Sequence, residues 1–294
     1  MKYMKKLFGG LEMTWPCIIV SAVLIAAYTA VMLLIPAARR TSLCDIGGDI
    51  PCWIIFAMII ISNCKTAKEA AAKTFVFFLI SQPLIYIFQA PFSELGLGLL
   101  RYYPPWALAT VLTIPMAMIG WHTRKKGWLA PVILSSMLIL LAVFAVNYFH
   151  TSLIFPPFHI LSALACILFL VMLIYGILQE RRQRILAWTV CAVTIAGSAV
   201  PIRQRQLCSG NLLLPEGVSY SDCAEVSVSD PSAGNAYLDD ERQNVRVASK
   251  KMKDFEVTLT GKDGSMLGRY YVRTVADREY LAYIQDIRMI EQAQ

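Results

Sequence analysis

Residues 127–179 read GWLAPVILSSMLILLAVFAVNYFHTSLIFPPFHILSALACILFLVMLIYGILQ, which is 53 residues without an Asp, Glu, Lys or Arg. An α-helix rises about 1.5 Å per residue, so about 20 apolar residues cross the ~30 Å hydrocarbon core of a bilayer. The stretch is therefore long enough for two membrane-spanning helices. Pro156 and Pro157 interrupt the helical pattern near the turn between them. This pattern predicts a mainly α-helical protein that crosses the membrane more than once.

Charge-free runs along the first 202 residues predict seven transmembrane helices. Their approximate bounds are residues 15–36, 50–64, 74–93, 102–121, 128–149, 156–178 and 185–202. The second run is short, because 15 residues reach only about 22 Å. We expect Asp49 to cap this helix, Pro51 to lie in its first turn, and the helix to continue into residues 65–73. The alternative is a re-entrant segment, which leaves six spans.

The composition supports a membrane protein and argues against a nucleic-acid partner. Of the 294 residues 57% are hydrophobic and 16% are charged, whereas a soluble domain carries roughly a quarter charged residues. Residues 1–202 hold 15 Lys and Arg against 6 Asp and Glu, and residues 203–294 hold 12 against 14. The basic residues are dispersed between apolar runs and do not form one basic face. The lipid bilayer is the expected partner.

The positions of the basic residues predict the orientation, because cytoplasmic loops are rich in Lys and Arg. With the N-terminus in the cytoplasm, the inner segments hold 12 of these residues and the outer loops before residue 203 hold three. The three outer residues are Arg39, Arg40 and Arg101. A re-entrant second segment would place Lys65, Lys68 and Lys73 outside, which disfavours that alternative. We therefore predict a multi-pass protein of the cell membrane whose C-terminal region, residues 203–294, is extracellular.

The C-terminal region changes to the period of a β-strand. Phe255, Val257 and Leu259 alternate with polar residues, as in a half-buried strand. Residues 262–265, KDGS, supply the positive-φ position of a hairpin turn, and residues 266–274 read as the returning strand. The pattern predicts an extracellular all-β domain, a small antiparallel sandwich.

The hairpin around KDGS and the Tyr- and Val-rich strand after it resemble the Ig-like modules of bacterial surface proteins. The resemblance covers residues 222–284. It implies an Ig-like arrangement of strands for this domain, and we expect a protein or cell-wall partner for its outer surface.

Four of the eight cysteines lie where oxidation is permitted under the predicted orientation. Cys208 and Cys223 are 15 residues apart in the extracellular region, and closing that loop contributes about 3 kcal/mol in the chain-entropy model. We predict a disulfide between them, with two free thiols as the alternative. Cys44 and Cys52 could pair with each other, and the sequence leaves this open.

Searches for catalytic motifs return nothing. The sequence has no H-E-x-x-H, no G-x-S-x-G, no P-loop and no C-x-x-C. We therefore name no catalytic residue, cofactor or metal site, and expect a protein that is not an enzyme. No charged residue lies inside a predicted span, which disfavours ion-coupled transport.

Two groups of polar residues are candidates for a ligand site. The first lies at the predicted outer ends of the spans and comprises Arg101, Asp45, Asp49, His150 and His159. Arg101 is suited to a carboxylate, a phosphate or a lipid headgroup. The aspartates and histidines are of the types that bind divalent metals, but their spacing does not show that they converge. The alternative is a solvated rim.

The second group lies within the predicted spans and is uncharged. It comprises Gln82, Gln89 and Asn147, the first two beside Pro83. These side chains either form hydrogen bonds between helices or line a polar pocket that a kink at Pro83 would open.

Three function classes remain, in this order. The first is a sensor, scaffold or assembly subunit with an outward β interaction domain. The second is a small-solute or lipid transporter, or a membrane subunit of one. The third is a membrane enzyme acting on a lipid-linked substrate at the outer face.

Overall fold

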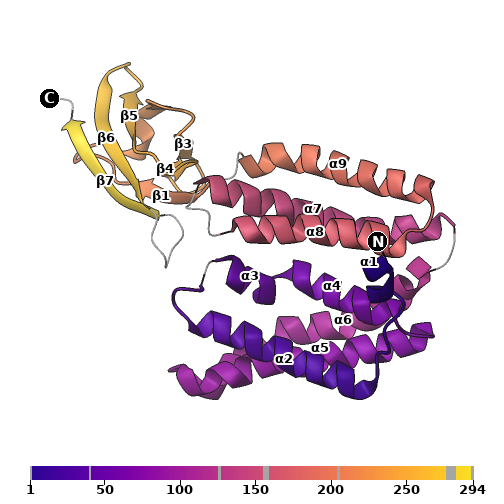
Figure 1. Cartoon of the computed structure of the whole chain (residues 1–294). Coiled ribbons are helices and arrows are strands. Elements are labelled where there is room, and N and C mark those ends of the chain that lie inside the picture. Colours follow the sequence, from indigo (N-terminus) through magenta and orange to yellow (C-terminus); the bar gives the residue numbers. More distant parts are fainter. Residues whose placement is uncertain are drawn as a thin grey trace. The chain divides into compact units, whose positions relative to one another are not determined.

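The computed structural model describes residues 2–39, 41–124, 127–154, 159–203, 206–275 and 283–292 (Figure 1). The chain divides into two compact units, residues 1–200 and residues 201–294. The first unit is built from helices and the second from β-strands. This agrees with the predicted helical region followed by a β region.

The helical unit contains several long apolar helices. The helices are α1 (Lys2–Leu7), α2 (Trp15–Leu34), α3 (Ser42–Gly48), α4 (Ile50–Ser62), α5 (Ala67–Gln89), α6 (Pro104–Trp121), α7 (Leu129–Ile154), α8 (Ile160–Ile177) and α9 (Arg181–Arg203), with 3-10 turns η1 (Ala90–Phe92), η2 (Gly96–Tyr102) and η3 (His122–Arg124). Among the described residues, six helices are long and apolar enough to cross a bilayer, namely α2, α5, α6, α7, α8 and α9. A seventh span results if α3 and α4, which meet at 45°, are counted as one.

The second predicted span is a short helix preceded by a bent one. The prediction that it continues into residues 65–73 is wrong, because α4 ends at Ser62 and α5 begins at Ala67. Thr66 starts the new helix, since its hydroxyl accepts a hydrogen bond from the Glu69 amide at 3.1 Å. The helical length that the short second span lacks lies before α4, in α3. Asp49 separates the two helices and forms no capping hydrogen bond with its side chain.

The helices pack around one large apolar core, and a smaller buried cluster lies between α7 and α8. α2 packs on α5, α5 on α6, and α7 on α8. The face of α2 toward the core is made of small residues, Ala22, Ala26 and Ala30, which let the helix backbones approach closely. Trp53 of α4 and Phe77 of α5 are buried in the centre of this core, with ring centroids 6.2 Å apart.

The β unit is a pair of antiparallel sheets that share one core. The strands are β1 (Cys208–Leu212), β2 (Cys223–Val228), β3 (Gly234–Asp239), β4 (Asn244–Ser249), β5 (Phe255–Gly261), β6 (Met266–Val275) and β7 (Tyr283–Gln292). One sheet has the order β1-β4-β3 and the other β2-β5-β6-β7. Residues of both sheets, including Val245, Val247, Val257 and Leu259, are fully buried together. Gly264 has φ +80° in the β5–β6 turn, as the KDGS hairpin requires.

The predicted disulfide is not formed. Cys208 and Cys223 are both free thiols, and no disulfide joins Cys44 to Cys52. Cys208 begins β1 of the first sheet and Cys223 begins β2 of the second. Burial raises the pKa of both β-unit thiols, which keeps them protonated and weakly reactive at neutral pH.

We therefore expect thiol mapping to find Cys208 and Cys223 reduced. Protein taken from the native membrane, denatured in the presence of an alkylating reagent, should carry the label on both residues in peptide mass spectra. The same treatment after chemical reduction should add no further label. A peptide linked through Cys208 and Cys223 would contradict the structure.

Replacing Gly234 by alanine should destabilise the β unit by about 1–3 kcal/mol. A Cβ atom at this position would lie only 2.3–2.6 Å from ring atoms of Phe255, and Phe255 is buried. The matched control is Asn235→Ala at the next residue, which is exposed and should change stability by less than about 0.5 kcal/mol. Urea unfolding of residues 201–294, followed by circular dichroism, compares the two. Equal stability of both variants would contradict the packing.

Candidate functional site

Asp45 of α3 lies in a buried group of polar side chains. Its Oδ2 atom accepts a hydrogen bond from Ser162 of α8 at 2.6 Å and lies 2.8 Å from Nδ1 of His159. An ionised carboxylate only accepts hydrogen bonds, so Nδ1 is the nitrogen of His159 that carries a proton. The side chains of Asp45 and His159 are 11% and 10% exposed. Asp45 thus contacts two residues that lie more than 110 positions away in the sequence.

Asp49 adds a second carboxylate from the break between α3 and α4. It stands at the N-cap position of α4 but does not cap the helix. Its Oδ2 atom instead accepts a hydrogen bond from the hydroxyl of Tyr148 on α7. The Tyr148 ring stacks on His159, with an interplanar angle of 9° and centroids 6.2 Å apart. We call Asp45, Asp49, Tyr148, His159 and Ser162 the Asp–His cluster.

The position of α3 brings the Asp–His cluster together. Thr29 of α2 donates a hydrogen bond to the carbonyl of Gly47 at 2.8 Å, and Tyr28 donates to that of Leu43 at 2.8 Å. A Cβ atom on Gly47 would lie 2.8 Å from both Tyr28 and Thr29, so glycine allows this close approach. On the opposite side, the amide of Ser162 donates to the hydroxyl of Ser42 at 3.0 Å. These bonds hold α3 between α2 and α8.

A small pocket opens beside the Asp–His cluster. It has room for about one water molecule and is lined by residues of α3, α4, α7 and α8. Its polar lining comes from Asp45, Tyr148 and Ser162. The remaining lining is carbon and sulfur and comprises Ile46, Pro51, Cys52, Ala165, Cys166 and Phe169.

Two carboxylates in an apolar helical unit are costly to bury. A carboxylate without partners would be protonated or would destabilise the fold, and even paired charges give little net stability. Apolar side chains could pack α3 against α8 at lower cost. The Asp–His cluster therefore has the character of a functional site.

The structure separates the predicted outer-rim residues into two places. Asp45, Asp49 and His159 lie together in the Asp–His cluster, whereas Arg101 lies in η2, which packs on α5 and α6. The Arg101 guanidinium donates to the Tyr102 hydroxyl at 2.6 Å and covers the Tyr102 ring at 4.8 Å. His150 lies on α7. Arg101 thus has no described contact with the aspartates.

The uncharged residues of the predicted spans do not line either described pocket. Gln82 is buried on α5, and Gln89 donates a hydrogen bond to Ile85 of its own helix at 3.1 Å. α5 continues through Pro83 as one helix. Asn147 lies on α7 next to Tyr148.

Sequence reasoning missed Tyr148 and Ser42. Tyr148 and Ser162 flank the break that Pro156 and Pro157 mark, as His159 does. The sequence signal that these residues belong to one site is that they lie near the same end of two neighbouring predicted spans. It does not reveal which face of each helix the side chains occupy.

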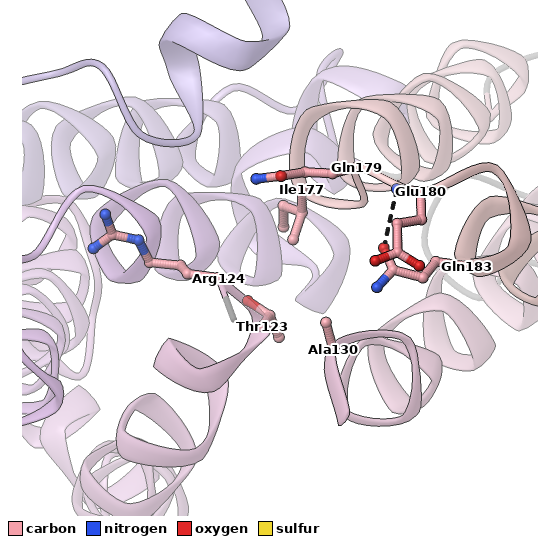
Figure 2. A pocket seen from close by; sticks show the side chains of 7 residues that line it. All are labelled: Thr123, Arg124, Ala130, Ile177, Gln179, Glu180 and Gln183. Atoms are coloured by element: carbon pink, nitrogen blue, oxygen red, sulfur yellow. Dashed lines mark hydrogen bonds between the residues drawn. The ribbon is translucent and has the colours of Figure 1, made fainter. Parts of the chain in front are cut away.

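A second pocket lies between the α6–α7 connection and the α8–α9 connection (Figure 2). It is lined by Thr123, Arg124, Ala130, Ile177, Gln179, Glu180 and Gln183. Gln183 accepts from the amide of Glu180 at 3.2 Å and donates to the carbonyl of Gly127 at 2.9 Å. Arg124 extends away from these residues in Figure 2 and donates to the carbonyl of Cys64. These groups are engaged in joining the helix connections, which is a structural role.

The opposite end of the bundle also has polar contacts that hold the N-terminal segment. The side chain of Asn63 donates to the carbonyl of Leu7 at 2.7 Å and accepts from the amide of Leu11 at 2.7 Å. Lys73 donates to the carbonyl of Met13 and to Glu69. The helical unit thus has polar side-chain contacts near both ends.

Comparisons with known proteins add no family. No protein-family model matches the chain, and neither a curated protein nor a solved structure is significantly similar to it. Within the described ranges, no group of three or more His, Cys, Asp or Glu side chains is arranged to hold a metal ion. The Asp–His cluster must therefore be interpreted from its own chemistry.

Replacing Tyr148 by phenylalanine should destabilise the helical unit by about 1–3 kcal/mol, because it removes the hydrogen bond to a buried carboxylate. The matched control is Tyr86→Phe, whose hydroxyl contacts the Tyr102 carbonyl at 3.5 Å and the Trp106 side chain but no described carboxylate. Thermal unfolding of the full chain in detergent measures both. A Tyr148→Phe variant as stable as Tyr86→Phe would show that Asp49 finds another partner.

Proposed function

We propose that this chain is a multi-pass membrane sensor that meets its ligand at the Asp–His cluster. In this proposal the helical unit spans the bilayer seven times, with α3 and α4 forming one broken span. The N-terminus is cytoplasmic and the β unit is extracellular. The β unit presents a recognition surface to a protein or cell-wall partner.

Exposed apolar side chains support the membrane location of the helical unit. Leu24 of α2, Leu108 of α6 and Val193 of α9 are 64%, 63% and 67% exposed. They belong to helices that are long enough to cross the hydrocarbon core. Lipid covers such side chains, whereas water would leave a large apolar surface unsatisfied.

The charge count supports the orientation. The Lys- and Arg-rich segments include residues 65–73 and 181–184, at the end of the bundle where Asn63 and Gln183 form their contacts. The Asp–His cluster lies at the starts of α3, α4 and α8 and near the end of α7. By the positive-inside rule, the basic end is cytoplasmic and the cluster is at the outer end.

The strand order of the β unit supports an Ig-like module. The orders β1-β4-β3 and β2-β5-β6 match the orders B-E-D and C-F-G of an Ig sandwich when β1 takes the place of strand B. The first Ig strand then has no counterpart, and β7 extends the second sheet beyond β6. Sandwiches of this kind often carry recognition surfaces on a stable scaffold.

The observation that carries the proposal is the pair of partly buried carboxylates, Asp45 and Asp49. Ionisable residues inside a membrane bundle are expensive and by default indicate function. Enzymatic chemistry is less favoured, because Ser162 donates to Asp45 and a nucleophilic serine would instead be activated by a base such as histidine. Arg101, which a phosphate-bearing lipid-linked substrate would need, lies on a different part of the unit.

Transport is the second candidate, and the break at Asp49 favours it. Many transporters bind substrates and coupling ions where a membrane helix is interrupted. Asp49 occupies such a break, between two helices that meet at 45°. We prefer a sensor to a transporter for two reasons. The Asp–His cluster lies near the ends of the helices, and the chain has a separate β unit that could take part in signalling.

Accessibility labelling tests the proposed topology. In a cysteine-free background, Lys68→Cys and Gln179→Cys should react with a membrane-impermeant maleimide only after permeabilisation, since inner segments hold most of the Lys and Arg. Glu94→Cys and Asn235→Cys should react in intact cells. All four positions are exposed, so differences report the side of the membrane. Asn235→Cys that reacts only after permeabilisation would place the β unit in the cytoplasm and overturn the proposal.

A further inference from the structure

We propose that one end of the helical unit binds anionic phospholipid headgroups in preference to zwitterionic ones. This end, which we call the basic end, is formed by α1, the α4–α5 and α6–α7 connections and the start of α9. The inference rests on one part of the proposed function, the insertion of the helical unit in a bilayer. It does not depend on which side of the membrane the basic end faces.

The N-terminal helix α1 is fixed at the basic end by two contacts. Phe8, directly after α1, is 7% exposed, and a Cβ atom on Gly176 of α8 would lie only 2.4 Å from its ring. The glycine therefore leaves the space that the ring fills. Asn63 at the end of α4 donates a hydrogen bond to the carbonyl of Leu7 at 2.7 Å. The helix α1 thus lies beside the ends of α4 and α8.

Two further contacts join the other segments of the basic end. Arg124 of η3 donates a hydrogen bond to the carbonyl of Cys64 in the α4–α5 connection. Gln183 in the first turn of α9 donates to the carbonyl of Gly127, before α7, at 2.9 Å. Because α8 leads into α9 through residues 178–180, the four segments meet at one end of the helical unit.

The basic end exposes cations that no other described residue engages. Their side chains form no hydrogen bond or ion pair within the described part of the chain, and they are Lys5, Lys6, Lys65, Lys68, Arg181 and Arg182. The exposed acidic residues described at this end are Glu12 and Glu180, whereas Glu69 is paired with Lys73. The described part of the basic end therefore presents an excess of positive charge to its surroundings.

The opposite end of the helical unit has no such excess. Within the described part of residues 2–200, its charged side chains are Arg39, Arg101, Asp45, Asp49 and Glu94. Arg39 donates a hydrogen bond to the carbonyl of Leu33 at 2.7 Å, and Arg101 contacts Tyr102. The two ends therefore differ in the charge that they can offer to a lipid headgroup.

Exposed tryptophans place the basic end at the depth of lipid headgroups. Trp15 begins α2 and Trp128 directly precedes α7, and they are 47% and 61% exposed. The ammonium of Lys73 lies 5.8 Å from the centre of the Trp15 ring. Indole rings favour the boundary between hydrocarbon and headgroups. The exposed cations of the same segments are therefore within reach of lipid phosphates.

The chemistry of the headgroup decides which lipid is preferred. Phosphatidylglycerol carries a phosphate whose charge no ammonium of the same headgroup balances, whereas phosphatidylcholine carries its own ammonium. Lys and Arg side chains near a membrane surface are attracted by anionic lipids. Several unengaged cations at one end therefore favour phosphatidylglycerol over phosphatidylcholine.

The test uses the full chain in vesicles and the quenching of its tryptophan fluorescence by lipids with brominated acyl chains. Mixtures of phosphatidylcholine with brominated phosphatidylglycerol are compared with mixtures that contain brominated phosphatidylcholine. The exposed Trp15 and Trp128 report on lipid beside the basic end. We expect an apparent binding constant at least about threefold higher for phosphatidylglycerol. The preference should disappear in about 1 M sodium chloride, where the screening length is about 3 Å.

Variants locate the preference. Lys65→Gln with Lys68→Gln should reduce the preference at least about twofold, and exposed side chains without partners can be replaced with little effect on the fold. The matched control, Arg39→Gln with Arg101→Gln, removes the same charge from the opposite end and should leave the preference unchanged. An equal reduction in both pairs would overturn the proposal, because it would show an effect of total charge alone.

The outcomes separate this proposal from the proposed function. Equal quenching by the two brominated lipids would overturn the preference for anionic headgroups and leave the membrane location supported. Absence of quenching by either lipid would overturn the membrane location and this proposal with it. Relief of phosphatidylglycerol quenching by inorganic phosphate, at constant ionic strength, would indicate a site for a small free anion and overturn the lipid assignment.

Discussion

A carboxylate buried among apolar helices must be hydrogen-bonded, and the contacts around Asp45 and Asp49 follow from this constraint. Asp45 obtains its partners from α8, and Asp49 obtains its partner from α7. Because bare burial of either group would cost several kcal/mol, α3, α7 and α8 must keep their relative positions. The stacking of Tyr148 on His159 joins the two pairs. Apolar packing alone would allow a wider range of relative positions for α3, α7 and α8.

The break between α3 and α4 makes the second carboxylate available. A residue at an N-cap position ordinarily uses its side chain to satisfy helix amides. Asp49 instead directs its carboxylate to Tyr148, and Pro51 near the start of α4 reduces the number of amides that need a partner. Gly47 lets the preceding helix lie against α2. The bend and the polar cluster are therefore parts of the same local arrangement.

The two units are stabilised by different physical effects. The helical unit leaves large apolar side chains on its surface and concentrates polar contacts near its ends. The β unit buries its apolar side chains between two sheets, as the alternation along β5 requires. Its stability does not need a disulfide, because Val245, Val257 and Leu259 already close a core. Because this core closes without a disulfide, Cys208 and Cys223 can remain as thiols.

The sequence by itself determined the apolar helices and the β hairpin, because both depend on local periodicity and on lengths set by backbone geometry. It also placed Asp45, Asp49 and His159 near the same end of the bundle. Only the tertiary structure decided that these three meet Tyr148, and that Arg101 lies elsewhere. It likewise decided that Cys208 and Cys223, which begin strands of different sheets, form no disulfide. Contacts between residues about a hundred positions apart depend on which helix faces pack together, and no local pattern encodes that choice.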